Sequence, residues 1–172
     1  AARDWTAPDA VIHPTGSGAG VVASHRAAAE LTELGLIEET PALYAAQAEG
    51  CAPIAEALES GDPVTPVERP DTIAGGVEDP DPPGGDAAVT ACSESGGGGV
   101  AVGDHDLLES AVRLTARAGV ELSVTGGVAA AAAWDLADRG EFDGDETLVL
   151  VNPDDGSKDA DVLRSHLMGQ GV

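Results

Sequence analysis

The chain has 172 residues, enough for one compact domain spanning 1–172, and carries 31 acidic against 8 basic side chains for a net charge of −23. This charge leaves no cationic surface for nucleic acid or an anionic membrane, and no apolar run approaches the ~18 residues that span a bilayer. The sequence is nevertheless 42% hydrophobic with periodic apolar runs, which excludes a disordered acidic chain. It predicts a folded protein adapted to concentrated salt, where a short Debye length screens the repulsion.

Short β-branched runs alternate with longer helical patterns in the first half of the chain. In order, we expect a strand at 10–13, a helix at 19–34, a strand at 43–47 and a helix at 52–58. Residues 61–85 are rich in Pro, Gly and Asp and predict a long surface connection, which in a compact domain is usually functional or covers something.

The same alternation continues in the second half. We expect a helix that begins after Asp86 and ends at 95, a flexible glycine joint at 96–99 and a strand at 100–102. A helix from Asp104 to 118 and a strand at 120–124 follow. The last expected elements are a helix at 127–137, a strand at 147–151 and a helix at 159–167. Asp86 and Asp104 are the expected N-caps, and the very hydrophobic strand at 147–151 is expected to be central. The pattern predicts an α/β fold, a mostly parallel open sheet with helices on both faces.

A glycine-rich turn, Gly16-Ser17-Gly18-Ala19-Gly20, lies between the first strand and the first helix. Such a turn directs backbone N–H groups into one concavity at the positive end of the helix dipole, which suits a phosphate monoester. The spacing fits neither the dinucleotide fingerprint nor the Walker loop. The alternative is a tight strand-to-helix turn that uses glycine only for its positive φ angles.

The turn belongs to a longer series of motifs. "HPTGSGAG" is followed by "YAAQAEGCAPI", "TIAGGVEDPDPPGG", "VAVGDHDLLESAVRLTARAGVELSVTGG", "FDGDETLVLVN" and "GSKDADVLRSHLMGQG". In this order the series resembles the C-terminal half of threonine synthase, an enzyme family of fold type II that uses pyridoxal 5'-phosphate (PLP). The resemblance implies part of the large domain of that fold, with Gly16 to Gly20 holding the cofactor phosphate.

The resemblance also implies a missing group. The family attaches PLP as a Schiff base to a lysine in its N-terminal half, and Lys158 is the only lysine of this chain. Lys158 falls in the family's C-terminal "GxKD" turn, so no residue here is assigned as catalytic. We therefore expect the chain to be inactive alone.

A second departure lies in the same turn. Relatives place a Thr or Ser hydroxyl against the pyridine nitrogen there, but this chain has Pro153, which can donate nothing. Asp154 or Asp155 could face the nitrogen and keep it protonated, the turn could have drifted because nothing binds there, or both aspartates could be acidic surface.

Thr125 opens a later helix where the family closes the far side of the cofactor pocket, so it is a second candidate contact; the alternative is an ordinary helix start. The four histidines show no metal-ligand spacing with Cys51 and Cys92, so no metal site is expected. Two cysteines are also too few for a disulfide framework, which is typical of a reducing cytoplasm.

The resemblance implies threonine synthase chemistry, in which O-phosphohomoserine is converted to threonine and phosphate. A serine or threonine dehydratase-like PLP enzyme is the alternative with different chemistry, and a truncated, non-catalytic remnant is the alternative from another class. Half of a two-lobed protein should leave apolar surface and strand edges uncovered, so we expect association with the missing N-terminal lobe or self-association. The expected ligand is a small amino-acid substrate.

Overall fold

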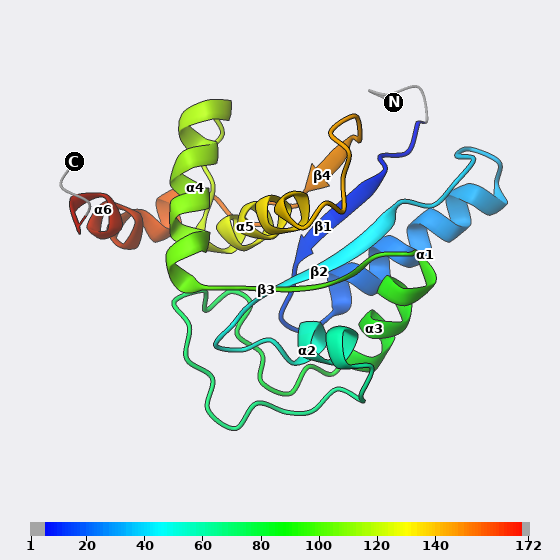
Figure 1. Ribbon diagram of the computed structural model, residues 1–172, viewed down its shortest axis with the longest axis horizontal. Coiled ribbons are helices and arrows are strands. Elements are labelled where there is room, and N and C mark those ends of the chain that lie inside the picture. Colours follow the sequence, from blue (N-terminus) through cyan, green and yellow to red (C-terminus); the bar gives the residue numbers. More distant parts are fainter. Residues whose placement is uncertain (1–5, 170–172) are drawn as a thin grey trace.

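The computed structural model describes residues 6–169, which contain a four-stranded parallel sheet with helices on both faces (Figure 1). The strand order is β3-β2-β1-β4. The elements are β1 (Ala10–Pro14), α1 (Ala19–Glu33), β2 (Ala42–Ala48), α2 (Pro53–Ser60), α3 (Gly85–Glu94), β3 (Gly98–Val102), α4 (Asp104–Ala118), α5 (Val124–Asp138), β4 (Leu148–Leu150), the 3-10 turn η1 (Gly156–Asp159) and α6 (Ala160–Gly169). The α/β class and the parallel sheet predicted from the sequence are confirmed.

Strand β2 is buried on both faces, because helices cover the sheet from two sides. Leu43 and Ala45 pack against α1, α2 and α3, whereas Tyr44, Ala46 and Ala48 face α5 and the start of α4. In Figure 1 the three early helices lie on one side of the sheet, α5 crosses the other, and α6 lies beside α4. Double burial explains why β2 reads as a near-continuous apolar run rather than an alternating one.

Helix α5 is the central packing unit of the second face. Its first nine residues, from Val124 to Ala132, are all buried, and five of its positions in succession are alanine. A Cβ atom on Gly127 would overlap the carbonyl oxygen of Leu107 and lie 3.0 Å from the Cβ atom of Ala111. Small residues therefore allow α4 to approach the backbone of α5 closely.

The strand expected at 120–124 is wrong. Residues 120–123 form no strand, and Val124 is already the first residue of α5. The N–H of Leu122 donates to Thr115 Oγ1 at 3.1 Å, and its side chain is buried against α4 and α5. Leu122 anchors this short connection, whereas Val120 is exposed, and neither residue pairs in the sheet.

The strand at 147–151 was expected to be central, and this is also wrong. Strand β4 comprises Leu148–Leu150, lies at one end of the strand order and pairs with β1 alone. Val149 is 40% exposed. Hydrophobicity indicates that a strand becomes covered, but it does not identify the element that covers it.

Two expected helix caps are replaced by glycines. The N-cap of α3 is Gly84, with Asp86 in the first turn, and the N-cap of α4 is Gly103. The carboxylate of Asp104 instead accepts hydrogen bonds from Thr72 Oγ1 at 2.6 Å and from the N–H of Ile73 at 2.9 Å. Asp104 therefore anchors the 61–84 connection, which contains no helix or strand.

The glycine run at 96–99 is only partly the joint that was expected. Gly96 has a φ of 76° and follows the end of α3, but Gly98 and Gly99 belong to β3. A Cβ atom on Gly99 would lie 2.6 Å from the Cα atom of Ala55. The glycines of β3 thus allow α2 to pack directly on the sheet.

Replacement of Gly127 by Ala tests the contact between α4 and α5. The added methyl group overlaps a backbone carbonyl that cannot rotate away, so we expect the free energy of unfolding to fall by about 1–3 kcal/mol. Denaturant unfolding in molar potassium chloride measures it. The matched control is Gly75→Ala, where a Cβ atom meets nothing within 4 Å, and an equal loss in both variants would contradict the prediction.

Candidate functional site

The glycine turn connects the end of β1 to the start of α1. Gly18 has a φ of 82° and is the N-cap of α1, with no side-chain cap. Its N–H donates to Thr15 Oγ1 at 3.0 Å, while Ser17 Oγ accepts a long contact of 3.4 Å from the N–H of Ala19. Within residues 6–169, the N–H groups of Gly16, Ser17 and Gly20 donate to no acceptor. The turn therefore offers free donors at a positive helix end, as a phosphate site requires.

Gln47, at the end of β2, fixes the shape of this turn. Its side chain is fully buried. Its amide nitrogen donates to the carbonyl oxygen of Thr15 at 3.2 Å, and its amide oxygen accepts from the N–H groups of Ile54 and Ala55 at 2.8 and 3.0 Å. One side chain thus ties the glycine turn to β2 and to the start of α2. Sequence reasoning missed Gln47, although a lone amide inside the apolar run LYAAQA was a usable signal.

The 61–84 connection covers one side of the glycine turn. The N–H of Gly84 donates to the carbonyl oxygen of Ser17 at 3.0 Å. A Cβ atom on Gly16 would lie 2.9 Å from the carbonyl oxygen of Val77, and one on Gly18 would lie 2.7 Å from that of Gly84. Gly16 and Gly18 are therefore required by close backbone approach, and Gly18 also by its positive φ.

The imidazole of His13 packs under the first turn of α1, in the space where a side chain on Gly20 would lie. Burial lowers the pKa of His13 below its ordinary value, because the charged form loses hydration there. A neutral ring at this position adds no positive charge to the turn. The free backbone N–H groups are therefore the feature of the turn that attracts an anion.

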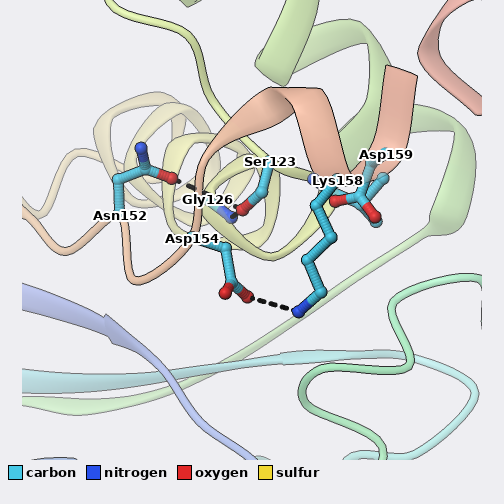
Figure 2. Close-up of polar contacts among 7 residues, drawn as sticks. Ser123, Gly126, Asn152, Asp154, Lys158 and Asp159 are labelled. Atoms are coloured by element: carbon cyan, nitrogen blue, oxygen red, sulfur yellow. Dashed lines mark hydrogen bonds and ion pairs between the residues drawn. The ribbon is translucent and has the colours of Figure 1, made fainter.

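A second group of site residues surrounds a cavity of about 400 Å³. The cavity is lined by residues 73–76, by Val124 and Thr125 of α5, and by Lys158 and Asp159. Figure 2 shows Lys158 extending toward Asp154, and Lys158 Nζ lies 3.1 Å from Asp154 Oδ2. This ion pair is partly exposed, so solvent screens it and its contribution to stability is small.

The turn after β4 is fixed on the start of α5 (Figure 2). Ser123, the N-cap, accepts from the N–H of Gly126 at 3.0 Å and donates to Asn152 Oδ1 at 3.4 Å. Asp159 Oδ2 accepts from the N–H of Val124 at 2.7 Å. These contacts hold Asp154 and Thr125 on the same side of the fold, and sequence reasoning identified neither the Ser123 cap nor the role of Asp159.

The glycine turn and the Thr125 cavity are near neighbours. A Cβ atom on Gly76 would lie 2.5 Å from Thr125 Oγ1, while the next residue, Val77, places its carbonyl against Gly16. Gly76 and Val77 are adjacent in the chain, so the 74–77 segment lies against both groups. The structure therefore brings Gly16 to Gly20, Thr125 and Asp154 to one region of the molecule.

The described residues offer little for other chemistries. No group of three or more His, Cys, Asp or Glu side chains in residues 6–169 could hold a metal ion. Both cysteines are buried and free; burial raises the pKa of the Cys51 thiol and raises that of Cys92 to about 11. Neither thiol is therefore an activated nucleophile. Of the helices in this part of the chain, none is both long and apolar enough to cross a bilayer.

The chain has an α/β fold with a four-stranded parallel sheet and a glycine turn after its first strand, and solved structures of fold type II PLP enzymes share this fold. Threonine synthase from Escherichia coli superposes with a TM-score of 0.68 at 16% identity, covering 96% of this chain and 36% of that one. The processed form of threonine deaminase isoform 2 from Solanum lycopersicum superposes with a TM-score of 0.69 at 18% identity, covering 92% of this chain and 44% of that one. At these identities the likeness concerns the fold.

The family model for pyridoxal-phosphate dependent enzymes matches residues 2–154, so the chain belongs to that PLP-dependent family. Curated relatives are threonine synthases. That of Methanosarcina acetivorans is 31% identical over 149 residues, which are 86% of this chain and 37% of that protein. That of Methanocaldococcus jannaschii is 30% identical over 159 residues, which are 92% of this chain and 39% of that protein. The chain spans about two fifths of the length of these relatives.

Replacement of Gln47 by Leu tests the amide that holds the glycine turn. The variant leaves two buried N–H groups and one carbonyl without partners, so we expect unfolding free energy to fall by about 3 kcal/mol. Denaturant unfolding measures it. Thr90→Val, which removes one exposed hydroxyl contact to Asp86, is the control and should change stability by less than about 0.5 kcal/mol. Similar values for both would show that Gln47 does not organise the turn.

Proposed function

We propose that this chain forms the cofactor-phosphate half of a threonine synthase-like PLP enzyme. The observation that carries the proposal is the glycine turn, whose free N–H groups open at the start of α1 beside the Thr125 cavity. Gly16, Ser17, Gly18, Ala19 and Gly20 would hold the phosphate. Thr125 and Asp154 would form the far wall.

The residues present fit the cofactor. An anion at the glycine turn meets backbone donors without an acidic side chain in the first turn of α1. The cavity is lined by the polar residues Thr125, Lys158 and Asp159, and Lys158 pairs with Asp154; these polar groups suit the polar edge of an aromatic ring. When bound, PLP withdraws electrons from the substrate carbons; this chain would bind and orient it.

The substrate is inferred from the relatives. Threonine synthases match most of this chain at about 30% identity, which favours O-phosphohomoserine as substrate and threonine plus phosphate as products. Threonine deaminase shares the fold at 18% identity, so a serine or threonine dehydratase-like reaction is the second candidate. Pro153, which removes a hydroxyl from the turn, is the observation that favours a non-catalytic remnant.

The lysine that attaches the cofactor would come from outside these residues. Lys158 pairs with Asp154 and belongs to the turn after β4, which is fixed on α5. We infer that the remainder of a longer polypeptide, or a partner lobe, supplies it and covers the free edge of β4. Alternatively, a second copy of this chain covers the free edge of β4. The acidic composition and the two free thiols favour a cytoplasm rich in salt.

Replacement of Ala19 by Asp tests the phosphate site. Ala19 is exposed in the first turn of α1, so an added carboxylate favours the helix but repels a phosphate dianion. We expect the affinity for pyridoxine 5'-phosphate to fall at least about tenfold, measured by fluorescence titration in molar potassium chloride. Ala23→Asp adds the same charge one helical turn away and should have a much smaller effect. Equal effects would place the phosphate elsewhere.

The reaction is tested on the native polypeptide or complex that contains this chain, compared with the 172 residues alone. We expect phosphate release from O-phosphohomoserine only from the former, because the attaching lysine is needed. Ammonia release from threonine or serine without phosphate release would favour the dehydratase. If the native polypeptide or complex shows neither activity, that result would favour the non-catalytic remnant.

A further inference from the structure

The imidazole of His13 lies against the glycine turn from within the fold. His13 belongs to β1, and its Nε2 and Nδ1 atoms would be 2.8 and 3.0 Å from a Cβ atom on Gly20. Since a carbon–carbon bond is about 1.5 Å long, Nε2 lies within roughly 4.3 Å of the Gly20 Cα atom. The N–H of Gly20 is one of the free donors of the turn. The ring is therefore next to a group that would meet a phosphate oxygen.

The charges around this position leave a phosphate poorly compensated. A phosphate monoester brings about 1.5 to 2 negative charges, and neither the glycine turn nor the first turn of α1 contains a lysine or arginine. The residue opposite His13 on β2 is Ala45. From the 61–84 connection Asp79 approaches the turn, because its Cβ atom would lie 3.2 Å from one on Gly16. A proton on His13 would offset this negative charge.

The ring of His13 is able to change its charge in response to an anion. Burial lowers the pKa of His13, and the carbonyl oxygen of Pro14, 3.4 Å from Nδ1, raises it by less. The ring is therefore neutral at neutral pH before an anion arrives, and the free N–H groups attract the phosphate first. A nearby negative charge favours the protonated form, and salt screens a half-buried ring less than an exposed one.

We propose that His13 takes up a proton from the solvent when a phosphate monoester binds at the glycine turn, so that the imidazolium becomes the cationic side chain of the site. This rests on the proposed cofactor-phosphate site. By thermodynamic linkage, the proton and the ligand each raise the affinity of the protein for the other. Affinity for the phosphate therefore increases as the pH falls toward the range in which His13 titrates. At a pH where the ring is neutral with and without the ligand, His13 has no effect.

The test is calorimetric titration of pyridoxine 5'-phosphate into the full 172-residue chain, in molar potassium chloride and in two buffers of different ionisation enthalpy, which measures the protons taken up on binding. His13→Gln keeps a polar side chain that cannot be protonated. We expect it to take up fewer protons than the unaltered chain, to bind about threefold to tenfold more weakly near pH ~6.5, and to bind equally at about pH 9.

The matched control is His25→Gln. His25 lies further along α1 and faces Glu94 of α3 at 3.6 Å, away from the turn. It should take up as many protons and bind as tightly as the unaltered chain. A loss equal to that of His13→Gln would show that histidine substitution acts through the fold, and it would overturn the assignment to His13.

A second readout follows the ring in the unaltered chain and needs no variant. The ¹⁵N chemical shifts of the two ring nitrogens converge when an imidazole is doubly protonated, so the ligand should move those of His13 toward that pattern at about pH 7. Shifts that stay in the neutral pattern while pyridoxine 5'-phosphate binds would overturn the role of His13 and leave the phosphate site standing. Failure of the unaltered chain to bind this probe would instead overturn the proposed cofactor site, and this inference with it.

Discussion

The buried side-chain amide of Gln47 is the interaction on which the glycine turn depends. It satisfies the first N–H groups of α2 and a carbonyl of the turn at once, so the ends of β1 and β2 and the start of α2 keep one geometry. A turn rich in glycine has many accessible conformations, and fixing it costs conformational entropy. The amide, together with the 61–84 connection that packs against Gly16 and Gly18, removes that freedom before any ligand arrives.

Two helix starts lie close together in this fold, and they differ in electrostatic character. The start of α1 has Gly18 as a cap without a side chain and no acidic residue in its first turn. The start of α5 is capped by Ser123 and occupied by the Asp159 carboxylate. Since an anion is favoured where free N–H groups remain, the two starts would orient an elongated ligand with its phosphate toward α1. Orientation then follows from capping rather than from any cationic side chain.

The sequence was sufficient for the features that local patterns determine. The alternation of strands and helices, the glycine turn and the long connection were all predicted, because each depends on residues adjacent in the chain. The strand predicted at 120–124 and the central position predicted for β4 were wrong. Burial against α4 and pairing with β1 depend on contacts between segments that are far apart in the sequence. Asp104 was predicted as a cap and is a tether instead, and Gln47 was missed, since both act on segments far away along the chain. Thr125 and Asp154 were chosen from the resemblance, and their placement in one region of the molecule could not be read from spacing.

The pairing of β1 with β4 has a consequence for biosynthesis. Ala10 lies opposite Leu148, so this strand pair forms only after all the residues between β1 and β4 have been made. At typical translation rates the interval between the two strands is on the order of ten seconds. During that time the inner edge of β1 is open to any other strand, a setting in which parallel sheets form slowly and nascent chains aggregate. Mutual repulsion between highly acidic nascent chains would keep them apart through this interval.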